Sequence, residues 1–216
     1  MNILQTPIGR YAPGIMNVVV EIPKGSRKRY RYHRKRRAFV VDYRLMVSTP
    51  GEYGWVPETW AKGGKRVNAV VLARKPTWGG NVCEARPIGA LRRRDGDHQI
   101  ISVLLGEPRY EDIRNIHDLD ETALRRIAQF YEPFFPLEGW LARDAALEFL
   151  KETHGTFVQR LRKHGAAAVT EREEDDGFPD EFEPPEEDDE GDGQASRADA
   201  APAPPVAEEA VSVEQR

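Results

Sequence analysis

The sequence predicts an α+β fold in which a small closed β-barrel is followed by two helices and a highly charged C-terminal segment. Three features support this prediction. Short β-branched runs succeed one another in the first half of the chain without helical segments between them, which is typical of a closed barrel. Two stretches with the apolar spacing of amphipathic helices follow. The composition then changes abruptly after Gly165.

Six short segments have the composition of strands, because they are rich in β-branched and aromatic side chains and end at turn-forming residues. The basic turn His33–Arg37 joins the second to the third, and Gly79–Gly80 lies between the fourth and the fifth. The turn Asp95–Asp97 is typical of a β-hairpin. The predicted strands are Met16–Glu21, Arg29–Tyr32, Ala38–Tyr43, Val67–Ala73, Val82–Arg93 and His98–Leu105.

Two helices are predicted after these strands. Asp120 caps the first, which ends near Tyr131, and the second runs from about Ala142 to about His164 with Gly155 as a weak point. The apolar residues of each helix recur at intervals of three and four, as expected for one buried face. These faces comprise Leu124, Ile127, Ala128 and Tyr131 in the first helix, and Ala146, Phe149, Leu150, Phe157 and Leu161 in the second.

The charge distribution divides the chain of 216 residues into a basic body and an acidic tail. Glu171–Arg216 contains 18 Asp and Glu but only 3 Lys and Arg, a net charge of −15. The rest of the chain contains 18 acidic and 29 basic residues, a net charge of +11. We therefore expect a folded domain at residues 1–165 and a disordered acidic, Ala/Pro-rich tail at 166–216, since the tail has too few apolar side chains to offset chain entropy.

The remaining bulk features exclude a secreted disulfide scaffold and a membrane protein. The one cysteine, Cys83, cannot form an internal disulfide, and we expect a buried strand residue in a reducing compartment. The first residues lack the apolar run of a signal peptide, and no window approaches the roughly 20 apolar residues of a membrane span. The sequence thus predicts a cytoplasmic protein with no membrane partner.

Several ordered motifs within Val18–Trp140 resemble those of the soluble inorganic pyrophosphatases. Val18–Tyr32 contains the EIP motif of that family's opening strand, Glu52–Thr59 resembles its YGxxPxT turn, and Glu84–Asp95 resembles its RPxGxL strand. The resemblance implies an OB-like five-stranded β-barrel with two outer α-helices. It also implies magnesium as the cofactor, pyrophosphate or another phosphate anion as the ligand, and a homo-oligomer, because prokaryotic relatives form hexamers.

The acidic D-G-D-x-x-D turn, which holds the catalytic metals in that family, is altered in this sequence. Its six positions read Gly63, Gly64, Lys65, Arg66, Val67 and Asn68, so no aspartate remains. Mg²⁺ binds through hard carboxylate oxygens, and pyrophosphate hydrolysis needs several such ions at once. The sequence therefore predicts a magnesium site that is weak or absent.

Other positions keep part of the family's pattern. Arg29 replaces a lysine and retains its charge, whereas Phe134 and Phe135 replace a Tyr-Lys pair that binds phosphate after the first helix. The resemblance and the remaining charges together give the expected site. It comprises Asp95, Asp97 and Tyr53 as catalytic residues, Arg29, Arg44 and Lys65 as phosphate-binding residues, and Glu21, Asp95 and Asp97 as metal ligands.

The charges of this expected pocket oppose a cluster of metal ions. Its three carboxylates are outnumbered by four cations, namely Arg29, Arg31, Arg44 and Lys65. Like charges 4 Å apart repel by about 4 kcal/mol at an effective dielectric constant of about 20. Three interpretations stay open: Lys65 pairs with Asp95 or Asp97 in the vacated metal volume, the arginines bind phosphate without metal, or hydrolysis survives with fewer metals. We expect a catalytically degenerate phosphate- or polyanion-binding module, and the alternative is a divergent but active inorganic diphosphatase.

The segment Lys24–Arg37 contains nine Lys and Arg in 14 residues, interleaved with Tyr30 and Tyr32. On an OB-like barrel such a segment can bind single-stranded nucleic acid or another polyanion through phosphate contacts and base stacking. A solvated basic turn has the same pattern, and the chain's own acidic tail is a third candidate to contact it. The four tryptophans, Trp55, Trp60, Trp78 and Trp140, are expected to pack within the barrel and against the helices.

Overall fold

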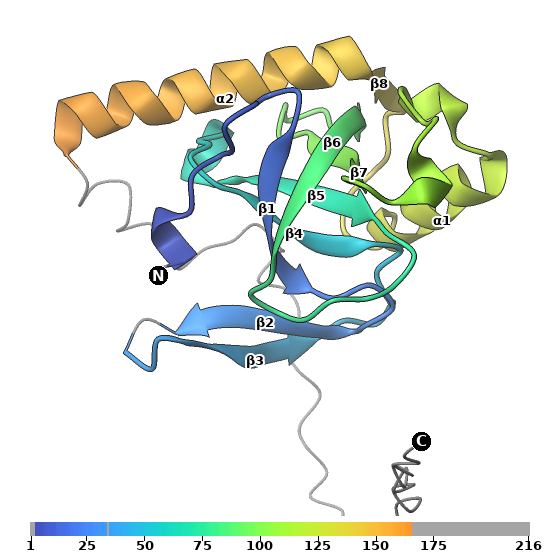
Figure 1. Cartoon of the computed structure of the whole chain (residues 1–216), viewed down its shortest axis with the longest axis horizontal. Coiled ribbons are helices and arrows are strands. Elements are labelled where there is room, and N and C mark those ends of the chain that lie inside the picture. Colours follow the sequence, from blue (N-terminus) through green and yellow to red (C-terminus); the bar gives the residue numbers. More distant parts are fainter. Residues whose placement is uncertain (1–2, 34, 166–216) are drawn as a thin grey trace, which may run out of the picture. The chain divides into compact units, whose positions relative to one another are not determined.

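Five strands close into a barrel in the computed structural model, which describes residues 3–33 and 35–165 (Figure 1). These strands are β1 (Met16–Ile22), β4 (Glu52–Val56), β5 (Val67–Leu72), β6 (Val82–Leu91) and β7 (Gln99–Leu104). Strand β1 pairs with both β4 and β6, so the order β1-β4-β5-β7-β6 returns to its start. Neighbouring strands are antiparallel, except that β5 and β7 run parallel. The predicted five-stranded, OB-like barrel is confirmed.

Two further strands, β2 (Lys28–His33) and β3 (Ala38–Arg44), form a separate antiparallel hairpin beside the barrel (Figure 1). A register shift between Arg29 and Tyr30 leaves Asp42 of β3 without an opposite residue. Strand β8 (Trp140–Ala142) extends the sheet beyond β6. Short 3₁₀ turns lie at Ile3–Gln5, Lys62–Gly64, Pro108–Tyr110 and Ile116–Asp118.

The sequence missed strand β4, because its EYGWVPET segment has the glycine and proline that are typical of a turn. The glycine has a packing role instead. Gly54 lies opposite Val20 in the β1–β4 ladder, and a Cβ at Gly54 would be 1.9 Å from the carbonyl oxygen of Val19. Only glycine lets the two strand backbones approach this closely.

Two helices cover the outside of the barrel: α1 (Glu121–Tyr131) and α2 (Arg143–His164). Both predicted helices are confirmed, and the Asp120 carboxylate caps α1 by accepting a 2.8 Å hydrogen bond from the Ala123 N–H. Helix α2 continues through Gly155 without interruption and packs against β6. The prediction that Leu161 lies on the buried face is wrong, because its side chain is 39% exposed.

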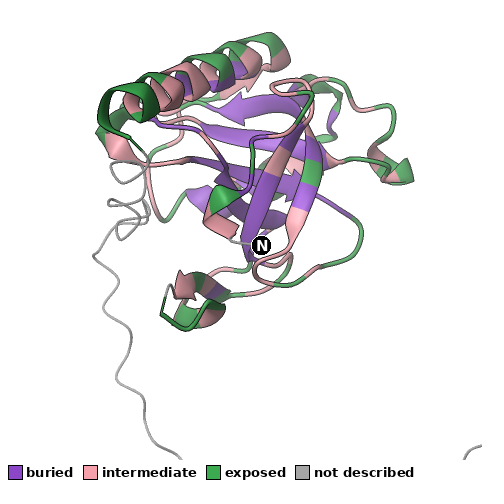
Figure 2. Cartoon of the chain, turned by 60° about the vertical axis from the view of Figure 1, so that its left-hand side comes forward, coloured by how far each residue is buried: buried purple, intermediate pink, exposed green. Residues whose placement is uncertain are grey.

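The core has two parts, and most barrel strands are buried along nearly their whole length (Figure 2). One part includes Tyr53, Ile127 and Phe130 and joins the barrel to α1. The other includes Ala146 and Leu150 of α2. A strand that is buried on both faces reads as a continuous apolar run, which is why β5 was predictable.

Cys83 is buried in β6, as predicted, and burial raises the pKa of its thiol to about 11. Among the described residues, no helix is long and apolar enough to cross a membrane. The acidic tail predicted for residues 166–216 lies outside the described residues, so the domain boundary at 165 stays a prediction.

We predict that Gly54→Ala lowers the free energy of unfolding by about 2–3 kcal/mol, because the added methyl group overpacks the β1–β4 interface. The matched control is Gly155→Ala in α2, where an added Cβ meets nothing within 4 Å. This control should stabilise the protein by about 0.5–1 kcal/mol, since alanine favours a helix over glycine. Urea denaturation of both variants is the measurement, and equal effects would contradict the close approach at Gly54.

Candidate functional site

Three of the predicted site residues lie in one buried cluster at the junction of the barrel and the hairpin. Glu21 of β1 and Arg29 of β2 form an ion pair of 3.3 Å between carboxylate Oε2 and Nη2, and both side chains are less than 7% exposed. Arg29 Nη1 also donates a 3.0 Å hydrogen bond to the hydroxyl of Tyr43. The charges of Glu21 and Arg29 act on Tyr53 of β4, so this tyrosine belongs to the same cluster.

The tyrosines of this cluster are largely desolvated. Tyr53 is 2% exposed and packs its ring 5.9 Å from that of Phe130 in α1. Burial raises the pKa of Tyr53 well above its ordinary value and also raises the pKa of Tyr43. Tyr53 is therefore a neutral hydroxyl at physiological pH, which can donate a hydrogen bond but cannot act as a base.

The other predicted carboxylates, Asp95 and Asp97, flank Gly96 in the turn between β6 and β7. We call Asp95–Asp97 the carboxylate turn. Arg93 pairs with both carboxylates, through Nη2 at 2.5 Å from Asp95 Oδ2 and Nη1 at 3.7 Å from Asp97 Oδ2. Its guanidinium also lies 4.0 Å from the ring centroid of Phe135, so the arginine is held between an aromatic ring and two acids.

The two carboxylates of this turn differ in environment. Burial raises the pKa of Asp97 to about 6, against the opposing effect of the Arg93 charge. Asp95 is more exposed, and although burial raises its pKa, the Asp97 N–H and the Arg93 side chain hold that pKa below its ordinary value. Asp97 Oδ1 is buried without a hydrogen-bond partner in the part of the chain that the structure describes.

Cations from the altered turn lie close to these acids. The charge of Lys65 lowers the pKa of Asp97, and Lys62 Nζ lies 3.4 Å from the position that a Cβ would take at Gly96. The parallel pairing of β5 with β7 explains this proximity. Residues 62–66 precede β5 and the carboxylate turn precedes β7, so both segments meet at the same edge of the barrel.

The structure places Arg44 apart from the other predicted phosphate-binding residues. Arg44 is exposed and lies opposite Lys28 in the hairpin, whereas Arg29 lies opposite Tyr43. Because neighbouring residues of a strand point to opposite faces, Arg44 and Arg29 lie on opposite faces of the hairpin. Asn68 lies in β5 and is 8% exposed. The charge of Lys65 lowers the pKa of Asp97, which agrees with the predicted proximity of these two residues. Arg93 forms an ion pair with the same carboxylate.

Sequence reasoning missed Arg93 and Lys62. The only local signal for Arg93 was that the run Arg92–Arg94 directly precedes the carboxylate turn, and nothing in the run singles out the middle arginine. Phe135 stands where the resemblance leads us to expect a phosphate-binding lysine, and Arg93 stacks on that phenyl ring. Arg93, before the carboxylate turn, therefore places a positive charge beside the position where the family's lysine would have supplied one.

These donors do not fit a centre of several divalent ions. Among the described residues, no group of three or more His, Cys, Asp or Glu side chains is placed to hold a metal ion. Glu21, Asp95 and Asp97 are each engaged with an arginine. A single ion could contact Asp97 Oδ1 and Asp95 only in competition with Arg93.

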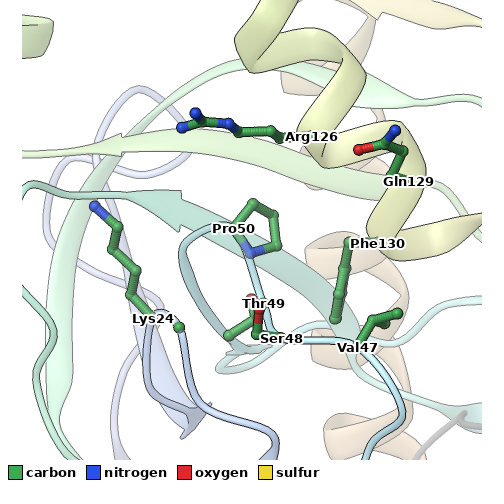
Figure 3. Close-up of a pocket in the computed structure, with 9 residues that line it drawn as sticks. Lys24, Val47, Ser48, Thr49, Pro50, Arg126, Gln129 and Phe130 are labelled. Carbon is green, nitrogen blue, oxygen red and sulfur yellow. The ribbon is translucent and has the colours of Figure 1, made fainter.

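A separate cleft of about 550 Å³ lies between the turn after β1, the loop before β4 and helix α1 (Figure 3). Lys24 and Arg126 approach it from two sides, and Phe130 forms part of its wall. Lys24 Nζ donates hydrogen bonds to the carbonyl oxygens of Ala73 and Arg74. None of the predicted site residues lines this cleft, so it is distinct from the carboxylate turn and the Glu21–Arg29 cluster.

Comparison with known proteins identifies the family. A family model described as inorganic pyrophosphatase matches residues 18–157. The inorganic pyrophosphatase of Thermus thermophilus is 33% identical over 162 residues, which are 68% of this chain and 93% of that protein. That of Synechocystis is 36% identical over 151 residues, 64% of this chain and 89% of that protein. The crystal structure of the Thermus thermophilus inorganic pyrophosphatase has a TM-score of 0.68 at 29% identity and covers 73% of this chain and 99% of its own.

We predict that Asp97→Asn stabilises the protein at pH 7.5 by about 2–3 kcal/mol, measured by urea denaturation in EDTA. The pKa of Asp97 is raised from about 3.8 when unfolded to about 6 when folded, so ionised Asp97 costs stability. That cost is absent below about pH 4 and complete above about pH 6. The gain in the variant should therefore vanish at pH 3.5, and an equal gain at both pH values would contradict a desolvated carboxylate. Asp112→Asn, in the loop before α1, is a matched surface control.

Proposed function

The chain belongs to the inorganic pyrophosphatase family, and from this premise we propose that it binds pyrophosphate or a related phosphate anion without assembling the family's metal centre. In this proposal the protein is a catalytically degenerate member that recognises its ligand through cations. Binding of magnesium, the cofactor that the resemblance implies, is weak or absent in this proposal. The scaffold of the family is kept, and the sign of charge at its metal-binding edge is reversed.

The observation that carries this proposal is the pairing of one arginine with both acids of the carboxylate turn. A divalent ion that binds Asp95 and Asp97 must share these carboxylates with the guanidinium of Arg93 or displace it. It must also approach Lys65 and Lys62, which surround the same turn. Repulsion between like charges at such distances amounts to several kcal/mol even at an effective dielectric constant of about 20.

A phosphate anion meets the opposite situation. Guanidinium groups bind phosphate oxygens in pairs, and arginine never loses its charge at physiological pH. Arg93, Lys65 and Lys62 come from two segments that the β5–β7 pairing holds together. Of the other predicted phosphate-binding residues, Arg29 is engaged with Glu21, and Arg44 lies on the other face of the hairpin. The cations around the carboxylate turn are therefore the stronger candidates to bind phosphate.

Hydrolysis of pyrophosphate is the second candidate function, because relatives that cover most of this fold are named inorganic pyrophosphatase. In addition, one buried carboxylate oxygen, Asp97 Oδ1, has no hydrogen-bond partner among the described residues. Asp95 and Asp97 would then hold a single divalent ion. Such an ion, when bound, would neutralise the diphosphate and activate a water molecule. Tyr53, as a neutral hydroxyl, would contribute a hydrogen bond rather than a base.

Two wider expectations accompany this proposal. A cytoplasmic location suits a chain whose single thiol is buried and unpaired. A homo-oligomer is the assembly that the family resemblance implies, and size-exclusion chromatography with light scattering tests it directly.

The decisive test is phosphate release from pyrophosphate by the full-length protein in excess Mg²⁺ or Mn²⁺. We expect turnover below about 0.1 s⁻¹, against the roughly 1–10³ s⁻¹ that is typical of enzymes. The Thermus thermophilus inorganic pyrophosphatase is the positive control. Calorimetry in EDTA should meanwhile detect pyrophosphate binding without metal. Turnover in the enzyme range would favour the divergent diphosphatase, and no binding in EDTA would exclude the metal-free anion site.

We predict that restoring the three acids, by Gly63→Asp, Lys65→Asp and Asn68→Asp together, tightens Mn²⁺ binding at least about tenfold, equivalent to about 1.4 kcal/mol. The change adds three carboxylates and removes one cation beside Asp97. Arg125→Asp with Lys151→Asp changes the net charge by the same −4 on the helices and is the control. Equal tightening in both proteins would show a general charge effect rather than a restored site.

A further inference from the structure

One face of the β2–β3 hairpin carries a row of half-buried aromatic side chains. Cross-strand pairs Tyr30↔Val41 and Tyr32↔Phe39 share this face, and the rings of Tyr32 and Phe39 have centroids 5.5 Å apart. The register pair Lys28↔Arg44 continues it at one end. The opposite face, with Arg29 and Tyr43, is the one that meets Glu21. We call the face with the aromatic row the hairpin face: Lys28, Tyr30, Tyr32, Phe39, Val41 and Arg44.

Cations flank both ends of this aromatic row. Lys28 and Arg44 are exposed at one end, and Lys35 and Arg36 are exposed in the turn at the other. Asp42 is the single acid in residues 28–44, and it forms a 3.2 Å ion pair with Arg31, which projects to the opposite face. The hairpin face therefore presents positive charge that no acid of the hairpin neutralises.

The loop between β5 and β6 packs against this face (Figure 1). A Cβ at Gly79 would lie 2.7 Å from the Tyr30 ring, and one at Gly80 would lie 2.5 Å from the Phe39 ring. The loop backbone is anchored to β1 by the Gly80 N–H, which donates a 2.7 Å bond to the Val20 carbonyl oxygen. Its contact with the hairpin is therefore close and fixed.

Trp78 is next to these glycines and is 68% exposed. The prediction that this tryptophan packs within the barrel or against a helix is therefore wrong. Arg74 and Lys75, in the same loop, are also exposed. An exposed indole on an anchored loop beside an aromatic row and a set of cations matches a stacking platform with phosphate contacts around it.

We propose that the hairpin face and Trp78 form a binding surface for single-stranded nucleic acid. Unpaired bases can stack on Trp78 and on the edge of the tyrosine row, while Lys28, Lys35 and Arg36 contact the phosphates. A duplex keeps its bases stacked within the helix and offers the indole no partner. The site is separate from the carboxylate turn, so this inference does not depend on the proposed function.

The acidic tail, with its net charge of −15, is a candidate competitor for the same cations. Such competition would weaken the apparent affinity of the full-length chain for every oligonucleotide. Low salt favours detection, because phosphate contacts dominate affinity and are weakened by salt.

The experiment measures fluorescence anisotropy of labelled 15-residue oligo(dT) and oligo(U) with the full-length protein in 50 mM and 200 mM salt. We expect saturable binding at 50 mM salt that weakens at 200 mM. Trp78→Ala should weaken it about tenfold, because base–aromatic stacking contributes roughly 1–3 kcal/mol per base. Tyr11→Ala, another side chain that is 64% exposed, is the matched control and should change nothing. Circular dichroism verifies that each variant is folded.

A second variant separates charge from stacking. Lys28→Ala, Lys35→Ala and Arg36→Ala together should weaken binding and reduce the slope of log affinity against log salt by about 2, since each lost contact to a single strand removes about 0.7. Arg125→Ala, Lys151→Ala and Arg162→Ala remove the same charge from the helices and should leave the slope nearly unchanged. Pyrophosphate binding should be unaffected in both.

Three results would overturn the inference. Absence of saturable binding below about 100 µM oligonucleotide at 50 mM salt would exclude the surface, given that even non-specific sites bind in the range of roughly 10⁻⁴–10⁻⁶ M. Polyphosphate binding as tightly as the oligonucleotides, with Trp78→Ala unaffected, would show that charge alone acts. Tighter binding of a 15-base-pair duplex would assign the surface to double-stranded nucleic acid instead.

Discussion

The buried ion pair between Glu21 and Arg29 fixes how the hairpin lies on the barrel, and the proposed nucleic-acid surface depends on that arrangement. It joins β1 of the barrel to β2 of the hairpin, and both side chains are almost completely removed from water. Two desolvated charges tolerate separation poorly, because losing one partner of a buried pair typically costs about 3–5 kcal/mol. The pair therefore directs one face of the hairpin, with Arg29 and Tyr43, toward the barrel. The other face, with Lys28 and the half-buried aromatic row, packs against the β5–β6 loop.

In the proposed function, the carboxylate turn changes its ligand while its scaffold persists. The β5–β7 pairing brings the altered turn and Asp95–Asp97 to the same edge, whatever their side chains are. In this chain that edge carries Lys62, Lys65 and Arg93 around the two acids. Neutralisation of the remaining acids by an arginine is the change that we propose makes this edge suited to anions. The fold and the chemistry are thus specified by different residues.

The sequence predicted elements well where one periodicity dominated, and poorly where a local signal conflicted with tertiary packing. Helix α1 was predictable to the residue from Asp120 and its apolar spacing. Strand β4 was missed because Gly54 reads as a turn residue, although its role is to let two backbones approach. Arg93 was missed because its contacts with Asp97 and Phe135 join three segments whose proximity no local pattern encodes. Trp78 was predicted to be buried but is exposed, because nothing in the local sequence distinguishes an exposed indole from a buried one.

The distribution of cations decides which of them can serve a phosphate ligand. Arg29 is held by a carboxylate in a nearly dry environment, and a phosphate could use it only by leaving Glu21 buried and unpaired. Arg44 is exposed on the far face of the same hairpin, beside Lys28. Arg93 differs from Arg29, because its partner Asp95 is about half exposed and regains solvent when it is released. A phosphate that displaces Asp95 from Arg93 therefore incurs a smaller desolvation cost than one that displaces Glu21 from Arg29. This difference favours the carboxylate turn as the location of the proposed anion site, and the Glu21–Arg29 pair as the contact that holds the neighbouring hairpin in place.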